Sequence, residues 1–249
     1  MDKICRLNNI LDNEKKLKNQ KEMFLATLTH DLKNPVQALL MTLKMFKNGM
    51  FGDLKGEQSE ILDNAIETSD FMQKMLCSIL STYKLDNGVT RLEKELVDID
   101  ALIKKCINEN NALASERLIK IVFINNCPNI KLYVDNARLR RVVGNLLNNA
   151  LNHAYKNTEL IIEIKREIEN ISFSFKNIGN PIPDKVKTHI FEKYFTGDSM
   201  TGTGLGLYFS KKVIEAHNGR IYFKNEGNEI IFKFELPISK NTEKAVIKF

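Results

Sequence analysis

The chain has 249 residues, of which 43% are hydrophobic and 27% charged, so it can bury a core and is neither disordered nor fibrous. Its net charge of +6 comes from 37 basic and 31 acidic side chains that interleave along the sequence, which argues against a nucleic-acid partner. The four cysteines lie far apart, so neither a disulfide framework nor a zinc site is expected. No apolar run approaches the ~20 residues that cross a bilayer, and we expect a cytoplasmic chain without a membrane segment.

The first part of the chain predicts helices. Residues 1–22 are rich in lysine and asparagine, with a thin apolar seam that favours a short helix or coiled-coil lead-in. From 23 to 88 two apolar stripes with helical periodicity flank a glycine-containing break at 48–56, which predicts an antiparallel helical hairpin. Two helices bury little surface, so we expect a homodimer that closes a four-helix bundle. The stripes are Leu25, Leu28, Leu32, Val36, Leu39 and Leu43, then Ile61, Ala65, Met72, Met75, Ile79 and Tyr83.

From residue 89 onward the pattern changes to short β-branched or aromatic runs that alternate with helical stretches. These runs are IKIVFI, KLYV, LIIEIK, ISFSF, RIYF and EIIFKFEL, and the helical stretches lie near 99–114, 136–155 and 204–217. The alternation is typical of an α/β sandwich with a mixed sheet, and residues 225–228 favour a hairpin between the last two strands. We therefore predict a lead-in at 1–22, a helical hairpin at 23–88, an α/β domain at 89–239 and a loose tail at 240–249.

A histidine and a carboxylate lie on the polar side of the first predicted helix. At about 100° per residue, His30 falls roughly 155° from the apolar stripe, and Asn34 shares its face one turn later. Pro35 costs a helix interior ~3 kcal/mol and is expected to bend it. Asp31 can accept one imidazole N–H and leave the other ring nitrogen as a nucleophile, which favours nucleophilic chemistry at His30. The alternative is an ordinary solvated His–Asp pair.

Three asparagines form an i, i+4, i+7 stripe on the helix predicted at 136–155. They are Asn145, Asn149 and Asn152. Each costs a helix ~0.6 kcal/mol relative to alanine, which is unfavourable unless the side chains bind something. Amide oxygens are hard ligands that suit Mg²⁺ together with phosphate oxygens. The alternative is a polar surface stripe in a chain that is rich in asparagine.

Two glycine-containing segments follow the predicted strand ISFSF. The first is NIGNPIP at 177–183, and the second is GTGLGL at 202–207, which opens the last predicted helix. A glycine-rich turn at a helix N-terminus offers free N–H groups and the positive end of the dipole to a phosphate. The motif alone is weak, because no GK[ST] follows it as in a P-loop and no strand directly precedes it as in a Rossmann fingerprint.

Taken in order, these motifs resemble the sensor histidine kinases of two-component signalling. THDLKNP resembles the H-box of the dimerisation and phosphotransfer hairpin. NLLNNA resembles the N-box, NIGNPIP the G1 box, IFEKYF the F-box and GTGLGL the G2 box of a Bergerat-type ATP-binding domain. The resemblance covers about residues 20–238, and the ordered set is far more specific than any single motif.

The resemblance implies a role for each matching position. His30 would take the γ-phosphoryl group of ATP, with Asp31 as its base or orienting carboxylate. Asn34 would assist a water that attacks the phosphorylated regulator, and Asn149 would bind Mg²⁺. The implied nucleotide-binding set is Asn145, Asn149, Asn152, Asn177, Gly179, Phe195, Gly202, Thr203, Gly204, Leu205 and Gly206.

The function implied by the resemblance is an ATP-dependent protein-histidine autokinase. It would pass its phosphoryl group to an aspartate of a response-regulator receiver domain and act as a phosphatase toward that regulator. The expected partners are a second copy of the chain and the response regulator. The chain is expected to work in the cytoplasm, alone or as the core of a larger or membrane-associated kinase.

Three positions depart from the family pattern, one of which is Pro181 in place of the second glycine of the G1 box. Asn177 stands where an aspartate usually accepts the adenine amino group, and an amide oxygen accepts that bond without charge. Asn152 stands where a phosphate-contacting lysine is frequent. Two alternatives therefore stay open: a dimeric signalling scaffold with weak or no ATP binding, and an ATPase or serine kinase of the same nucleotide-binding fold.

The remaining histidines carry no assigned chemistry. His153 and His189 are expected at the surface or at helix ends. His217, in the segment EAHNG, is expected at a helix C-terminus, where it would interact with the helix dipole.

Overall fold

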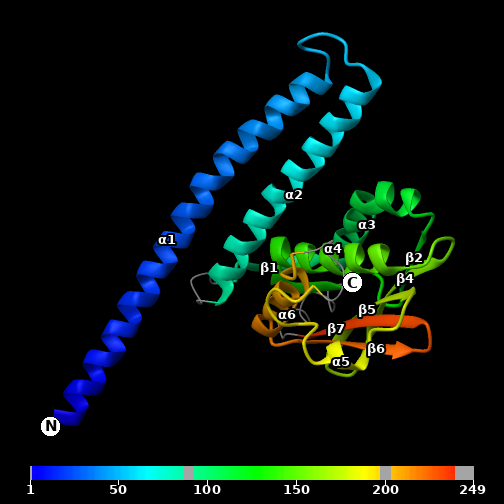
Figure 1. Cartoon of the computed structure of the whole chain (residues 1–249). Helices are drawn as coiled ribbons and strands as arrows, with labels where there is room; N and C mark the ends of the chain where they lie inside the picture. Colours follow the sequence, from blue (N-terminus) through cyan, green and yellow to red (C-terminus); the bar gives the residue numbers. More distant parts are fainter. Residues whose placement is uncertain (1, 87–91, 197–202, 239–249) are drawn as a thin grey trace. The chain divides into compact units, whose positions relative to one another are not determined.

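The computed structural model describes residues 2–86, 92–196 and 203–238. They belong to two compact units, Met1–Asn87 and Gly88–Phe249 (Figure 1). The predicted tail at 240–249 lies outside the described residues. No helix within the described ranges combines the length and the apolar character that a membrane crossing needs.

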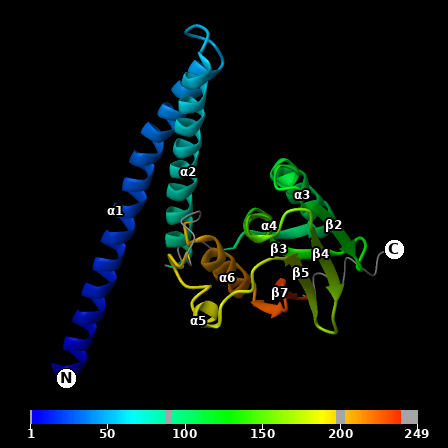
Figure 2. The same cartoon turned by 45° about the vertical axis from the view of Figure 1, so that its right-hand side comes forward.

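The first unit is a hairpin of two helices, α1 (Asp2–Lys47) and α2 (Gly56–Asp86), which lie side by side in Figures 1 and 2. Gly49 and Gly52 adopt positive φ angles of 75° and 109° in the connecting turn, as the predicted glycine-containing break requires. The segment predicted as a helical or coiled-coil lead-in is helical from residue 2. Residues 2–22 continue into the hairpin as one helix of 46 residues, because no glycine or proline interrupts the chain at that point. The helix also continues through Pro35.

Three leucines of the apolar stripe predicted on α1 stay exposed in the hairpin. Leu40 on α1 is buried, and it lies about 80° around the helix from Leu32. Leu28, Leu32 and Leu39 remain 39%, 49% and 46% exposed. Two antiparallel helices bury only the line along which they touch, and the flank that carries these leucines stays partly open to solvent. An exposed apolar stripe of this kind is typical of an interface with another chain.

The second unit is a two-layer α/β domain, as predicted. Its five-stranded sheet has the order β2-β4-β5-β7-β6, with β2 parallel to β4 and the other neighbours antiparallel. Three helices, α3 (Ile99–Glu116), α4 (Asn136–His153) and α6 (Gly206–Ala216), pack against the sheet. The strands are β2 (Lys120–Asn125), β4 (Glu159–Arg166), β5 (Asn170–Ile178), β6 (Arg220–Glu226) and β7 (Glu229–Pro237). The sheet is therefore mixed, and β6 and β7 form the predicted hairpin.

Two short elements complete the domain without having been predicted. Strand β1 (Lys94–Asp98) pairs with β3 (Lys131–Asp135) in a separate antiparallel pair. Three of the five β1 residues are charged and only Val97 is buried, so the strand gives little apolar signal. A single helical turn, α5 (Asp184–Lys187), follows the NIGNPIP segment.

The core lies between the sheet and the helices. Alternate residues of β5 and β7 point into it, and the rings of Phe173 and Phe234 stack there with their centroids 4.4 Å apart. Both side chains are fully buried, and burial of each contributes roughly 1.5–3 kcal/mol to folding. The period-2 alternation seen in the sequence therefore reflects one apolar and one polar face of the sheet.

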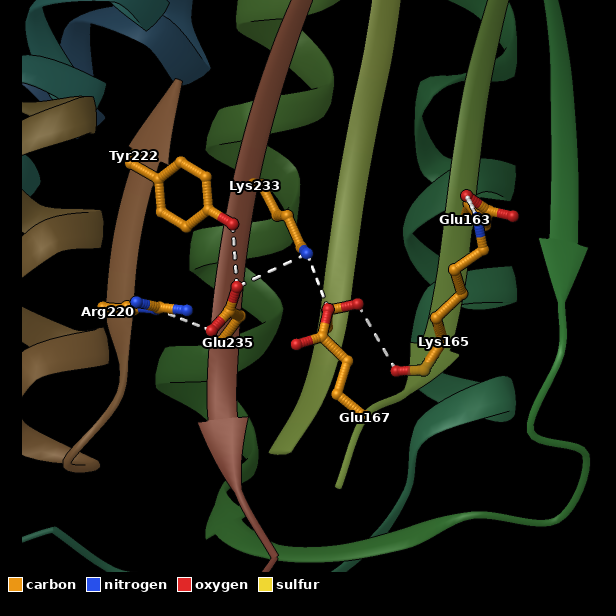
Figure 3. A network of polar contacts seen from close by, with 8 residues as sticks. Glu163, Lys165, Glu167, Arg220, Tyr222, Lys233 and Glu235 are labelled. Atoms are coloured by element: carbon orange, nitrogen blue, oxygen red, sulfur yellow. Dashed lines mark hydrogen bonds and ion pairs between the residues drawn. The ribbon is translucent and has the colours of Figure 1, made fainter. Parts of the chain in front are cut away.

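The other face of the sheet carries a network of charged side chains (Figure 3). At its centre Glu235 is only 2% exposed. Its carboxylate accepts hydrogen bonds from Arg220 Nε at 2.6 Å and the Tyr222 hydroxyl at 2.7 Å, and it pairs with Lys233 Nζ at 3.4 Å. Lys233 also binds Glu167 at 2.7 Å. A recess of about 180 Å³ on this face is lined by β4, β5, β6 and β7 residues, on the opposite side of the sheet from the core.

We predict that Glu235→Gln destabilises the domain by about 1–3 kcal/mol, because an amide cannot accept from all three donors around it. Burial raises the pKa of the Glu235 carboxyl, but the hydrogen bonds from Arg220 and Tyr222 outweigh burial and hold the pKa below its ordinary value of 4.5. The network therefore stabilises the fold above about pH 4.5 and loses this contribution as the pH falls further. Urea unfolding between pH 7 and pH 3 measures both effects.

Glu226→Gln is the matched control, because Glu226 is exposed on the neighbouring strand β6. It should change the unfolding free energy by less than about 0.5 kcal/mol. Equal losses in the two variants would contradict a special role for the network.

Candidate functional site

Helix α4 positions the predicted asparagines. Asp135 caps its N-terminus: the side-chain oxygen accepts a hydrogen bond from the Arg138 N–H at 3.0 Å. The helix buries one apolar face against the sheet and leaves Asn145 and Asn149 half-buried at its side. The buried face consists of Leu139, Val142, Val143, Leu146, Leu147, Ala150 and Leu151.

Asn145 lies against the first turn of α6. Its Nδ2 donates to the Gly206 carbonyl at 3.0 Å and lies 3.4 Å from Ser210 Oγ. Ser210 is fully buried and its hydroxyl also donates to the Gly206 carbonyl, at 2.9 Å. The structure therefore brings Asn145 together with the glycine turn, as the sequence motifs suggested. The amide nitrogen of Asn145 is therefore engaged in holding that turn in place.

Asn152 has a different neighbour. Its side chain is exposed, and its Oδ1 accepts a hydrogen bond from the Arg117 guanidinium at 3.3 Å. Arg117 follows the end of α3 and lies 35 residues earlier in the chain. The three asparagines of the predicted stripe therefore do not share one environment, because Asn152 bonds at the α3 side and Asn145 at the α6 side.

Asn177 is buried at the end of β5. It follows the alternation that points Phe173 and Phe175 into the core, and it is only 2% exposed. Its Nδ2 has no hydrogen-bond partner among the described residues. A buried polar group left unpaired costs about 1–3 kcal/mol. An apolar side chain at this position would avoid the cost. The amide nitrogen of Asn177 is therefore suited to donate a hydrogen bond to a bound ligand.

Gly179 brings the end of β5 against the end of α4. A Cβ at this position would lie 2.3 Å from the His153 carbonyl oxygen and 3.3 Å from Asn177 Nδ2, so only glycine allows the approach. The Tyr155 N–H donates to the Ile178 carbonyl at 2.8 Å and secures the same junction. The buried amide, the end of α4 and the glycine thus lie together.

The glycine turn before α6 packs on the segment that contains the predicted F-box. Gly204 has a φ of 63°, and a Cβ there would lie 2.4 Å from the Tyr194 carbonyl carbon. The Tyr194 N–H donates to the Gly204 carbonyl at 3.0 Å, next to the half-buried Phe195. Gly202 lies outside the described residues.

Among the described residues, no side chain caps the N-terminus of α6. Its N-cap residue is Leu205, which is buried and makes no capping hydrogen bond through its side chain. Thr203 Oγ1 accepts from the Leu205 N–H at 3.3 Å, one residue before the helix. The first N–H groups of α6 therefore keep the donor capacity and the positive dipole end that favour an anion.

His217 holds the other end of α6. Its Nδ1–H donates to the Val213 carbonyl at 2.8 Å, and its Nε2 accepts from the Asp135 N–H at 3.0 Å. The helix-end position was predicted, and the bond to the Val213 carbonyl joins the ring to the last turn of α6. The residue is buried, and a ring that accepts at Nε2 is neutral. No local pattern in the sequence indicates the bond to Asp135, which lies 82 residues away.

The predicted catalytic residues lie on α1. Asp31 and Asn34 are exposed on this helix, and Pro35 follows them. His30 is part of the helix, and its side chain lies outside what the structure describes. Among the described residues, no group of three or more histidine, cysteine or acidic side chains could hold a metal ion. A metal at this site would depend on amide oxygens and on a bound ligand.

Two family models match the chain. Residues 20–88 match the His Kinase A (phospho-acceptor) domain. The matched range contains His30, the later part of α1 and all of α2. Residues 134–240 match the Histidine kinase-, DNA gyrase B-, and HSP90-like ATPase family, which includes α4, β5 and α6. Together the two matches cover more than half of the chain.

Curated relatives and solved structures agree with these matches. The sensor histidine kinase YvrG of Bacillus subtilis is 29% identical over 220 residues, which is 87% of this chain and 38% of YvrG. Full-length ShkA in complex with AMPPNP has a TM-score of 0.74 at 24% identity, over 86% of this chain and 45% of ShkA. The histidine kinase ThkA in complex with the response regulator protein TrrA has a TM-score of 0.61 at 22% identity, over 91% of this chain and 66% of ThkA. At these identities the two structures establish the fold.

We predict that the domain loses stability as the pH falls below about 6.5, because burial lowers the pKa of His217, an effect that the Val213 carbonyl only partly offsets. Below that pH the unfolded chain binds a proton that the folded chain resists, so the folded state becomes less favourable. His217→Phe should weaken this pH dependence and cost about 1–3 kcal/mol at pH 7.5, because the Asp135 N–H loses its buried acceptor.

Thermal melting between pH 7.5 and pH 5.5 measures the effect. His189→Gln is the control, since His189 is exposed and should leave the profile unchanged. Burial also lowers the pKa of His153, so part of the pH dependence should survive in His217→Phe. An identical profile for His217→Phe and the wild type would contradict the prediction.

Proposed function

This chain belongs to the sensor histidine kinases of two-component systems, and from this premise we propose that it is an ATP-dependent protein-histidine autokinase. It phosphorylates His30 and passes the phosphoryl group to an aspartate of a response-regulator receiver domain. The observation that carries the proposal is that one chain joins a phospho-acceptor hairpin containing His30 to an ATPase domain with a buried, unpaired amide. The chain spans 38% of YvrG, so the activity is proposed for the part that is present.

The nucleotide site lies, in this proposal, where α4, the end of β5 and the start of α6 meet. Asn177 and Gly179 would hold the base, and the uncapped first turn of α6 would hold phosphate. The AMPPNP in the ShkA structure supports a nucleotide of this class. The full proposed set is Asn145, Asn149, Asn152, Asn177, Gly179, Phe195, Gly202, Thr203, Gly204, Leu205 and Gly206. Asn152 would have to exchange its bond to Arg117 for the nucleotide.

Asn149 is the proposed ligand of Mg²⁺. It lies one helical turn after Asn145 and is half-buried, so its amide oxygen can meet a hard cation beside phosphate oxygens. Bound Mg-ATP supplies the γ-phosphoryl group, and the metal neutralises its charge. The chain's own task is then to position groups, since phosphoryl transfer needs little covalent chemistry from the protein.

His30 is the proposed nucleophile and the phosphoryl acceptor. A neutral imidazole has one lone-pair nitrogen, and a carboxylate that accepts the other N–H fixes the tautomer and stabilises the developing charge. Asp31 is adjacent in sequence and carries the carboxylate for this role. Asn34, exposed one turn later, would orient a water toward the phosphorylated regulator and so give phosphatase activity.

A second copy of the chain is the proposed partner of the hairpin. Leu32 and Leu39 are seven residues apart, and Leu28 precedes Leu32 by one turn, so the three form a continuous exposed stripe along α1. Pairing this stripe with its copy would close a four-helix bundle. The response regulator in the ThkA complex supports a receiver domain as the second partner.

We predict that incubation with γ-labelled ATP and Mg²⁺ labels the wild-type chain and that His30→Gln is not labelled. The label should be lost in acid and retained in base, because a phosphoramidate bond to imidazole is acid-labile. Replacement of the nucleophile removes the acceptor itself, so the loss should be complete rather than partial.

His189→Gln is the control for general effects of losing a histidine and should be labelled like the wild type. Label that persists in His30→Gln would favour a serine kinase of the same fold. A chain that binds no nucleotide and takes no label would favour the signalling scaffold. Either result would contradict the proposed autokinase.

A further inference from the structure

We propose that Asn177 makes this site accept 6-oxopurine as well as 6-aminopurine nucleotides, so that the chain binds GTP with an affinity close to that for ATP. The inference rests on the proposed function, since it assumes that a purine nucleotide occupies the corner formed by α4, β5 and α6. It goes beyond that function, because it assigns the base specificity of the site to one side chain.

The first observation is the state of the Asn177 side chain. Its three inward-facing neighbours on β5, Ile171, Phe173 and Phe175, are all fully buried and apolar. Asn177 continues this row at 2% exposure with an amide nitrogen that has no partner among the described residues. The amide group is therefore held in a dry environment, where an unmet hydrogen bond matters most.

The second observation is that the backbone beside Asn177 is already paired. The Gly179 N–H donates to the Asn228 carbonyl at 2.9 Å, and the Ile178 carbonyl accepts from the Tyr155 N–H at 2.8 Å. Asn177 itself is in register with Ile230 of β7. These backbone groups cannot read the edge of a base without giving up a bond of the fold. Discrimination at this edge consequently depends on the Asn177 side chain.

The third step is the chemistry of an amide. A carboxamide carries both an acceptor oxygen and a donor nitrogen, and a 180° turn of the terminal group exchanges them. At position 6, adenine presents an amino donor, whereas guanine presents a carbonyl acceptor. Asn177 can meet either group, with its oxygen toward the amino group of adenine and its nitrogen toward the carbonyl of guanine. A carboxylate can only accept, so it would repel the guanine carbonyl.

Isothermal titration calorimetry of the whole chain with AMPPNP and GMPPNP, each with Mg²⁺, tests the inference. For the wild type we expect the two dissociation constants to agree within about tenfold, which is the worth of one neutral hydrogen bond. For Asn177→Asp we expect GMPPNP to bind at least about 100-fold more weakly than AMPPNP, because a buried carboxylate would face the guanine carbonyl.

Asn180→Asp is the matched control. Asn180 is an exposed asparagine three residues further along, bonded through its Oδ1 to the Tyr155 hydroxyl, and the change should leave the ratio of the two constants as in the wild type. Circular dichroism establishes that each variant is folded. If the buried carboxylate of Asn177→Asp unfolds the domain, the wild-type ratio alone decides the question.

The outcomes separate the inference from the proposed function. A wild-type chain that binds AMPPNP but prefers it to GMPPNP by more than about 100-fold overturns the inference and leaves the kinase proposal intact. An unchanged ratio in folded Asn177→Asp also overturns it. A wild-type chain that binds neither nucleotide overturns the proposed function together with the inference.

Discussion

The site depends on α6 being fastened to α4 at both of its ends. At the start of α6, Asn145 donates to the Gly206 carbonyl. At its end, His217 accepts from the Asp135 N–H, and Asp135 is the residue that caps α4. Both bonds join residues more than 60 positions apart, and the second is buried. Because each end is tied, the first turn of α6 keeps a fixed place beside the asparagines of α4.

The third wall of the site is added by strand β5. Its end is drawn against the end of α4 at Gly179, where no side chain would fit. The corner is thus built at the ends of regular elements, which define position better than a loop does. Within it the groups left over by the fold are a buried amide at Asn177 and the uncapped N–H groups of α6. The amide suits the hydrogen-bonding edge of a base, and the N–H groups suit phosphate. The contacts that close the fold here therefore also position the two ends of the proposed nucleotide site.

Local patterns in the sequence predicted much of this domain. Alternating apolar residues located the five strands of the main sheet, and helical periodicity located α3, α4 and α6, because both signals come from burial of one face. Strand β1 was not predicted, because only Val97 among its five residues is buried and the apolar alternation is therefore absent. The sequence pattern did not show that the helix predicted at 1–22 and the first helix of the hairpin form one continuous α1, because the change from a polar to an apolar composition near residue 23 resembles a domain boundary.

The candidate site was predictable as a set of motifs but not as a set of bonds. Asn145 and the glycine turn were both singled out, and the hydrogen bond that joins them depends on the tertiary fold. The partner of Asn152 is Arg117, and that of His217 is Asp135, each set by chain segments far apart in sequence. Nothing in the local pattern indicates that the Asn177 amide is both buried and unpaired.

The proposed nucleotide site is the corner between α4, β5 and α6. A crystal structure of the chain grown with AMPPNP and Mg²⁺ would test it most directly. We predict that the base lies within about 3 Å of the Asn177 amide and that the phosphates lie at the first turn of α6. A nucleotide bound elsewhere, with the Asn177 amide still unpaired, would contradict it.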